Sequence, residues 1–245
     1  MDIITGMVSC IIPVVKNDPY IEDCINSIKY QTYWNYEIIV VDEGLERSQQ
    51  RNIGIRRARG EFILWIDADM RLSWFVLSGC VRAIKNCTAL YIPEIITTKG
   101  WFGRVRNWER QFYNGSLVDV PRFIRKSDCP FFDEEQIGTE DSDWKNQVMY
   151  DNPRAIFDII HSPFYHQDDI SILQYFRKKA YYAKSLGVYK KKNPDDKLLT
   201  FKYRCWDVFT EKGKWKKFVS KPHYALAVIV MVFIRGIIFL TVPKR

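Results

Sequence analysis

The sequence predicts an α/β protein in which helices flank a mostly parallel β-sheet. Three observations lead to this fold class: apolar runs rich in β-branched residues, helical patterns between those runs, and acidic residues at the ends of two of them. Strands buried on both faces of a parallel sheet have such continuous apolar runs. Strands and helices that alternate at this spacing are typical of right-handed βαβ units. The 245 residues allow one sizeable domain and an appendage.

Four segments are expected to form the strands of this sheet. Each is a short apolar run that ends at a polar or turn-forming residue. The expected strands are residues 8–15 (VSCIIPVV), 37–41 (EIIVV), 61–66 (EFILWI) and 89–92 (ALYI), and they are followed by Lys16, Asp42, Asp67 and Pro93.

Three helices are expected between these strands. The first follows Asp18-Pro19, a cap and first-turn proline, and has isoleucines at helical spacing. The third covers residues 73–86 and opens with Ser73 as its cap. The second covers residues 48–59, exposes Arg51, Arg56 and Arg59, and ends at Gly60 as a C-cap.

The composition indicates a globular protein with an anionic partner. Thirty-seven basic and 29 acidic residues give a net charge of +8, and the excess is concentrated between Lys202 and Lys221. A nucleotide, a phosphate-bearing lipid, a membrane surface or a nucleic acid would suit this charge. The six cysteines lack metal-ligand spacing and are expected to be reduced, structural thiols. The N-terminus lacks the pattern of a signal peptide, so the bulk of the chain is expected in the cytoplasm.

The C-terminal residues 224–242 are apolar except for Arg235. As a helix they would span about 28 Å, close to the ~30 Å hydrocarbon thickness of a bilayer. The basic, aromatic segment before them, which contains Trp206 and Trp215, suits a cytoplasmic membrane interface. We therefore expect a catalytic domain at 1–195, an interfacial segment at 196–222 and a membrane-inserted helix at 223–245, with the domain on the cytoplasmic side of the cell membrane. A buried core helix is the alternative.

Asp67-Ala68-Asp69 is the main candidate site. Two carboxylates on a turn after a buried strand suit Mg²⁺ or Mn²⁺ held together with phosphates. Asp42 ends a neighbouring strand, and ligands of parallel sheets bind beyond the carboxyl ends of strands. Alternatively, the acidic pair only forms the turn.

The order and spacing of three motifs give this site a family context. Residues 37–44 (EIIVVDEG), 51–54 (RNIG) and 58–69 (ARGEFILWIDAD), together with the opening strand 8–13, resemble the family 2 glycosyltransferases over about residues 7–185. The chain is similar to membrane-associated dolichyl-phosphate sugar synthases and to the catalytic domain of cellulose-synthase-like enzymes. The resemblance implies the GT-A fold, a Rossmann-like fold with a nucleotide-sugar site.

The resemblance also implies roles for single residues. Asp42 would contact the nucleotide base, Asp67 the nucleotide-sugar, and Asp69 the metal that bridges the diphosphate. Pro13 and Arg51 would belong to the donor-binding residues. Val14-Val15-Lys16 follows Pro13 where the family often has Thr-Tyr-Asn, which leaves the choice of nucleotide open.

Residues 138–144 (GTEDSDW) contain three further acids, which suit a solvated loop or a helix start. They also resemble the family's Glu-Asp motif, which carries the catalytic base. We therefore expect Asp141 to be the base of an inverting transfer, with Glu140 and Asp143 as second choices.

The last candidates follow residue 165. His166 is either a packed residue or, by the resemblance, a residue near the metal or diphosphate. Gln174 and Arg177 resemble half of the Gln-x-x-Arg-Trp motif of processive family members, and Lys178 replaces its Trp, which argues against processive synthesis. Gln174, Arg177 and Lys178 either hold the donor diphosphate or form the solvent-exposed face of an amphipathic helix. Residues 101–112 (WFGRVRNWERQF) are either an interfacial acceptor element or ordinary packing.

Three hypotheses of function remain open. The first is an inverting, metal-dependent transfer of a sugar, such as mannose or glucose, from a nucleoside-diphosphate sugar to a dolichyl or polyprenyl phosphate in the membrane. The second is the same chemistry on a lipid-linked oligosaccharide or another glycan. The third is a non-catalytic, membrane-tethered, anion-binding protein. A nucleic-acid partner is not expected, because the sequence has no nucleic-acid motif.

Overall fold

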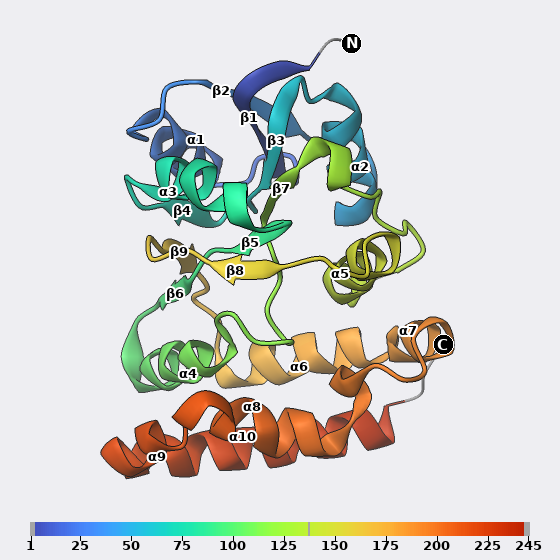
Figure 1. Cartoon of the computed structure of the whole chain (residues 1–245). Coiled ribbons are helices and arrows are strands. Elements are labelled where there is room, and N and C mark those ends of the chain that lie inside the picture. The colour runs from blue at the N-terminus through green and yellow to red at the C-terminus, as the bar shows by residue number, and fades with distance from the viewer. Residues whose placement is uncertain (1–2, 137, 243–245) are drawn as a thin grey trace.

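The computed structural model describes residues 3–136 and 138–242, and Figure 1 shows its layers. A six-stranded sheet of order β2-β1-β3-β7-β5-β8 forms the centre, and a three-stranded sheet of order β4-β9-β6 lies beside it. The strands are β1 (Ile4–Pro13), β2 (Tyr36–Val41), β3 (Gly60–Trp65), β4 (Met70–Leu72), β5 (Ala89–Tyr91), β6 (Glu94–Thr97), β7 (Phe123–Arg125), β8 (Phe157–Ile159) and β9 (Phe164–Gln167).

The large sheet is mostly parallel, as predicted. β1 pairs in parallel with β2 and β3, and β5 pairs in parallel with β8. Only β7 runs antiparallel to its neighbours β3 and β5. The register sets Pro13 of β1 opposite Val41 of β2, so the residues that follow these strands lie at one edge of the sheet. The α/β class with helices on both sides is therefore confirmed.

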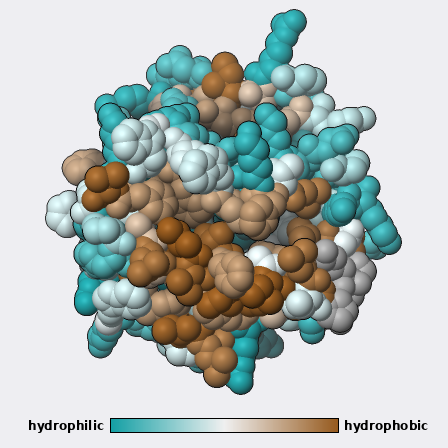
Figure 2. Space-filling model, turned by 90° about the horizontal axis from the view of Figure 1, so that it is seen from below, coloured by the Kyte–Doolittle hydropathy of each residue, from teal (hydrophilic) through white to brown (hydrophobic). Residues whose placement is uncertain are grey.

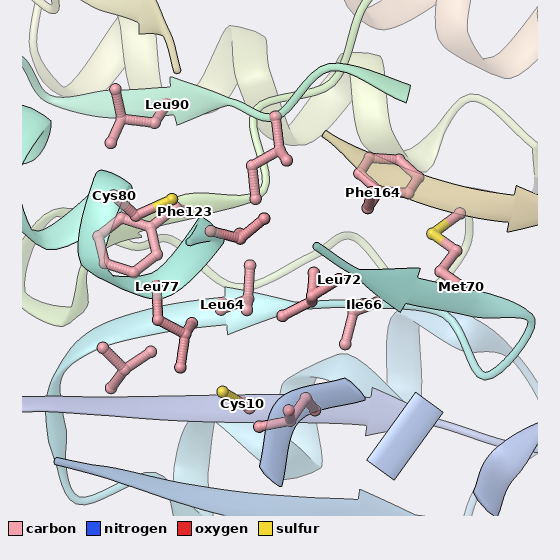
Figure 3. Close-up of a cluster of buried hydrophobic side chains, with 14 of the residues drawn as sticks. Cys10, Leu64, Ile66, Met70, Leu72, Leu77, Cys80, Leu90, Phe123 and Phe164 are labelled. Carbon is pink, nitrogen blue, oxygen red and sulfur yellow. The ribbon is translucent and has the colours of Figure 1, made fainter. Parts of the chain in front are cut away.

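Helices cover both faces of this sheet (Figure 1). On one face, α1 and α3 pack on Cys10 and Leu64, as Figure 3 shows for part of this core. On the other face, α2 and α5 pack on Ile11 and Trp65. The helices are α1 (Ile21–Lys29), α2 (Arg47–Arg57), α3 (Val76–Ala83), α4 (Gly100–Tyr113), α5 (Glu140–Asp151), α6 (Ile172–Ala183), α7 (Leu186–Lys192), α8 (Val208–Thr210), α9 (Lys216–Ser220) and α10 (Pro222–Thr241).

Three predicted helix ends are wrong. Helix α1 begins at Ile21 after Tyr20 as N-cap, and α3 begins at Val76, so neither Asp18 nor Ser73 is the capping residue. Helix α2 ends at Arg57, and Gly60 belongs to β3. A Cβ at Gly60 would lie 2.5 Å from the carbonyl oxygen of Met7, so glycine is needed there because two strands approach closely.

The exposure expected for Arg51 is also wrong. Its side chain is completely buried, whereas Arg56 and Arg59 are exposed. The reason lies in the site described below, where Arg51 has two carboxylate partners.

A third apolar cluster forms a helical layer below the sheets. It joins Val105, Trp108 and Phe112 of α4 to Phe209 of α8 and Val228 of α10. Helix α10 has a mean hydropathy of 2.4 and is long and apolar enough to cross a membrane. In the structure it lies along α4 and α6, at the bottom of Figure 1. The segments expected at 196–222 and 223–245 thus pack on the domain; residues 243–245 lie outside the described residues.

Candidate active site

Asp67 lies at the edge of the large sheet where β1, β2 and β3 end. The backbone N–H of Ile66 donates to the carbonyl of Ile11 at 3.0 Å, which continues the β1–β3 ladder up to the site. Asp67 accepts a hydrogen bond from Arg51 Nη2 at 3.1 Å. Two further guanidinium groups, of Arg122 and Arg47, lie 3.6 and 3.8 Å from its Oδ2. Burial raises the pKa of Asp67, but the three arginines outweigh it and lower the pKa well below its usual range.

Arg51 connects Asp67 to the predicted catalytic base. Its Nη1 lies 2.5 Å from Oδ1 of Asp141, in the first turn of α5. The Arg51 guanidinium also stacks over the ring of Phe132, 5.1 Å from its centroid. The Asp67 and Asp141 side chains remain 15% and 26% exposed, so both carboxylates can be reached from solvent. One buried cation therefore brings together two carboxylates that lie 74 residues apart in the sequence.

The first turn of α5 holds the two second-choice bases in different environments. Negative side chains are favoured there by the helix dipole. Glu140 is buried and lies 3.9 Å from Arg47, and burial together with the Asp141 charge raises the pKa of its carboxyl. Asp143 is also buried, and its two oxygens bind Lys192 at 2.6 Å and Asn193 at 3.0 Å. Asp141 is thus the most accessible of the three carboxylates.

The small sheet brings His166 to Asp69. Met70 of β4 pairs with His166 of β9, and Asp69 directly precedes Met70, so Asp69 and His166 are neighbours. His166 Nε2 lies 3.2 Å from Asp69 Oδ2, and His166 Nδ1 lies 2.6 Å from Glu94 Oε1 at the start of β6. Burial lowers the pKa of His166, but its hydrogen bonds to Asp69 and Glu94 raise it to about 9. Burial raises the pKa of Glu94, but Arg110 and His166 lower it to about 2.

Asp69 and His166 fit a divalent cation that takes its remaining ligands from phosphate and water. Asp69 Oδ1 is buried without a hydrogen-bond partner among the described residues. Glu94 orients the His166 ring, as second-shell carboxylates do in metal sites. Residues 3–136 and 138–242 contain no cluster of three or more potential ligands, so the protein alone would supply two. Asp69 would supply the carboxylate that Mg²⁺ or Mn²⁺ uses together with substrate phosphates, and His166 would supply an imidazole nitrogen.

Pro13 and Asp42 border the same edge of the sheet. Val14 N–H donates to the Val41 carbonyl at 3.0 Å, which extends the β1–β2 pairing past Pro13. Asp42 is exposed directly after β2. Two strand spacings, about 10 Å, separate the ends of β2 and β3. This spacing separates the candidate base-binding residue Asp42 from Asp67.

The predicted residues on α6 have different environments. Gln174 forms a capping box with Ser171: the Ser171 N–H donates to Gln174 Oε1 at 2.8 Å, and the Gln174 N–H donates to Ser171 Oγ. Arg177 and Lys178 are exposed. Lys178 lines a cavity of about 200 Å³ that also contacts His166, Lys179 and Arg235. The Gln174 side chain thus caps the start of α6, whereas Lys178 lines the cavity that reaches His166.

Three site residues were not predicted. Arg47 and Arg122 neutralise Asp67, and Glu94 orients His166. Arg47 and Arg122 have no distinctive sequence pattern around them. Glu94 had a usable signal, because it follows the apolar run ALYI and Pro93 much as Asp42 and Asp67 follow theirs.

Comparisons with known proteins agree with this architecture. Residues 9–50 match the family model described as glycosyl transferase family 2. EpsH of Bacillus subtilis, named as a glycosyltransferase, is 33% identical over 108 residues, which cover 34% of this chain and 30% of EpsH. Glycosyltransferase GlyG of Streptococcus pneumoniae is 28% identical over 90 residues, covering 26% of this chain and 30% of GlyG. The matched region is under a third of the length of these relatives.

Solved structures extend the likeness to most of the chain. The mannosyltransferase PcManGT from Pyrobaculum calidifontis, solved with GDP-Man and Mn²⁺, has a TM-score of 0.59 at 13% identity, covering 96% of this chain and 87% of that one. TarS of S. aureus has a TM-score of 0.51 at 16% identity, covering 93% of this chain and 54% of that one. At these identities the likeness establishes the fold, and the expected GT-A fold is confirmed.

Proposed function

We propose that this chain, whose sequence and fold match those of the family 2 glycosyltransferases, transfers a sugar from a nucleoside-diphosphate sugar to a lipid phosphate. One observation carries the proposal: buried Arg51 bridges Asp67 at the end of β3 and Asp141 on α5. This contact holds a candidate donor-side carboxylate and a candidate base on one guanidinium group. Enzymes that join two substrates need such fixed geometry.

The donor would lie along the carboxyl edge of the sheet. Asp42 and the loop after Pro13 would contact the base, and Asp67 the sugar-nucleotide, with Arg47 and Arg122 close to its diphosphate. Asp69 and His166 would hold Mg²⁺ or Mn²⁺, which neutralises charge on the departing diphosphate. The presence of GDP-Man and Mn²⁺ in the PcManGT complex supports this choice of donor and cation.

Asp67 and Asp141, held by Arg51, suit a single displacement. The acceptor oxygen forms a bond to the anomeric carbon while the bond from that carbon to the diphosphate oxygen breaks. The nucleoside diphosphate leaves with the electron pair, and attack from the opposite face inverts the configuration. Asp141 takes the proton of a hydroxyl acceptor, or orients a phosphate acceptor that is already ionised.

The cavity of about 200 Å³ below His166 supports an anionic acceptor. Its lining carries more basic than acidic side chains, because Lys178 and Lys179 add to arginines that already have acidic partners. Neither lysine forms a salt bridge within residues 3–136 and 138–242. The cavity reaches from His166 to Arg235 of α10, a helix long and apolar enough to cross a membrane. A polyprenyl or dolichyl phosphate has the matching chemistry, with mannose or glucose as the transferred sugar.

The test is a transfer assay with the full chain in detergent. Radiolabelled UDP-glucose and GDP-mannose are each offered with a polyprenyl phosphate, with a polyprenyl diphosphate–sugar, or without acceptor, in Mn²⁺ or in EDTA. We expect Mn²⁺-dependent label in the lipid-phosphate product from one donor. Transfer only to the diphosphate–sugar would mean that this lipid, and not the lipid phosphate, is the acceptor. Transfer that EDTA does not change would contradict the cation site. Donor binding without transfer to either lipid would contradict the lipid acceptor.

A further inference from the structure

Helix α10 has one covered and one open apolar face. Its covered side packs Ala225, Val228 and Met231 into the lower cluster. Its open side carries large apolar residues at helical spacing, each between 46% and 83% exposed. Figure 2, which views the molecule from below, shows hydrophobic side chains gathered at the centre of this surface and hydrophilic ones around it. We call this stripe the lower face; it consists of Leu226, Ile229, Val230, Phe233, Ile237 and Leu240.

An ion pair fixes the orientation of α10 on the domain. Arg235 Nη2 lies 2.5 Å from Glu109 Oε1 of α4, and Arg235 also donates to the Tyr175 and Tyr113 hydroxyls at 3.0 and 3.3 Å. If α10 crossed a bilayer as an isolated helix, Arg235 would enter the hydrocarbon and Glu109 would remain buried without its cation. Both changes are unfavourable. They would also expose Val228 and Met231, which are now buried.

The margin of the lower face is basic and aromatic. Lys212, Lys216 and Lys221 are exposed in and around α9, which packs beside α10. Trp206 and Trp215 are 66% and 52% exposed in the same layer. Lysine and tryptophan around an apolar face are typical of helices that lie in the headgroup region of a membrane. A two-fold contact between copies of this chain would instead bring like charges together.

We propose that α10 lies flat in the headgroup region of an anionic membrane, with the lower face toward the acyl chains and the lysines on the lipid headgroups. The helix stays docked on α4 and α6 and does not cross the bilayer. Membrane binding by the lower face is independent of whether the chain transfers a sugar. If the proposed function holds, it also keeps the cavity at Lys178 and Arg235 near the lipid surface.

Depth measurement separates a flat from a crossing helix. Single cysteines replace Leu226, Phe233 and Leu240 in a full chain whose partly exposed Cys129 and Cys205 are serine, and each carries a nitroxide label. On vesicles that contain phosphatidylglycerol, the accessibility of the labels to oxygen and to a polar nickel complex reports their depth. We expect three similar, shallow depths. A label at 233 near the bilayer centre, with those at 226 and 240 shallow, would overturn the flat orientation.

Flotation with the same vesicles tests the lower face itself. Phe233→Asp should weaken binding at least tenfold, because a charge replaces an apolar side chain in the membrane. The matched control is Trp34→Asp, which changes an 84% exposed aromatic residue outside this layer and should bind like the original chain. Lys216→Gln together with Lys221→Gln, both at exposed lysines, should weaken binding about 30-fold, since each lysine near the surface contributes about fivefold to the binding constant.

Three results would overturn the proposal. They are equal flotation of the Phe233→Asp and Trp34→Asp variants, equal binding to neutral and anionic vesicles at low salt, and a dimer in solution that Phe233→Asp dissociates. The last would assign the lower face to a second copy of the chain. Circular dichroism melts of each variant verify that the compared proteins are folded.

Discussion

Two arginines, the completely buried Arg51 and Arg235 with a side chain 14% exposed, form ion pairs with different consequences in two regions of the chain. Arg51, near the edge of the sheet where β1, β2 and β3 end, and Arg235 in the lower helical layer each lie 2.5 Å from a carboxylate oxygen. Arg51 joins Asp67 and Asp141, both of which remain partly open to solvent. Arg235 joins Glu109, whose side chain is only 5% exposed. The ion pairs of Arg51 therefore leave both carboxylates accessible to solvent. The ion pair of Arg235 instead encloses the Glu109 carboxylate between helices.

The comparison predicts that changes near Arg51 affect catalysis and that changes near Arg235 affect stability and docking. Removing one partner of a sealed pair leaves an uncompensated buried charge. Removing one partner of an open pair leaves a carboxylate that water can still solvate. Five variants test this difference, and those expected to cost most activity or stability come first.

Asp141→Asn should have the largest effect. A positioned general base contributes about 10²–10⁴-fold to the rate, so turnover should fall by that factor. Donor affinity, measured by calorimetry, should stay close to its original value because Asp67 and Asp69 are unchanged. Asp151→Asn, at the exposed end of the same helix, is the matched control and should transfer normally. Substantial turnover by Asp141→Asn would remove Asp141 from the mechanism.

Arg235→Met should destabilise the protein by about 3–5 kcal/mol, because Glu109 loses its cation inside the lower layer. Chemical denaturation measures this loss of unfolding free energy. The double variant Arg235→Met/Glu109→Gln should recover a large part of it, since no charge is then left buried. If the single and double variants were equally unstable, the ion pair would not fix α10.

Arg51→Met is the counterpart in the upper region. It should lower transfer more than stability, because Asp67 and Asp141 can be solvated when their common partner is gone. Turnover and denaturation of the Arg51→Met and Arg235→Met proteins are measured side by side. A loss of stability at Arg51 as large as that at Arg235, with turnover retained by the folded fraction, would break the comparison.

Glu94→Gln should lower the affinity for Mn²⁺ about 10–100-fold, which is typical for residues that orient a metal-binding histidine. Titration of Mn²⁺ by electron paramagnetic resonance in the presence of a nucleoside diphosphate measures this affinity without turnover. An unchanged affinity would mean that His166 is not a ligand.

Lys179→Gln should have the smallest effect, about tenfold on the KM for lipid phosphate with the donor KM unchanged. Burial lowers the pKa of Lys179 to about 8, so its positive charge is also expected to be lost as the pH rises through that value. The acceptor KM of the original chain should therefore increase above pH 8, and that of Lys179→Gln should change less. Equal pH profiles would exclude Lys179 from the acceptor site.

The sequence predicts those site residues that stand next to an apolar run in the chain. Asp42 and Asp67 directly follow the apolar runs 37–41 and 61–66, and Asp69 lies two residues further. The parallel pairing of β1 with β2 and β3 places these strand ends together. The pairing of β9 with β4 has no local signal, since it joins residues almost 100 positions apart through strands of three and four residues. For this reason only the family resemblance points to His166. Its partner Glu94 follows an apolar run and Pro93, so its local signal resembles that of Asp42 and Asp67.

Burial of charged residues was the hardest property to predict. Arg51 lies in a polar helical pattern that suggests exposure, and only the three-dimensional positions of Asp67 and Asp141 explain its burial. The length and hydropathy of α10 suggested a membrane crossing. Its orientation depends on Glu109, 126 residues earlier in the chain, which no periodicity reveals.

Thermal unfolding with a panel of UDP- and GDP-sugars in Mn²⁺ measures whether Asp67 and Asp69 form a sugar-nucleotide site. A ligand at 100 times its Kd adds about 2.7 kcal/mol, which corresponds to an increase in Tm of about 5–10 °C for a chain of this size. We predict such an increase for one nucleotide class, its loss in EDTA, and its loss in Asp69→Asn. An unchanged Tm with every sugar nucleotide, or the same increase in Asp69→Asn, would mean that Asp67 and Asp69 do not form such a site.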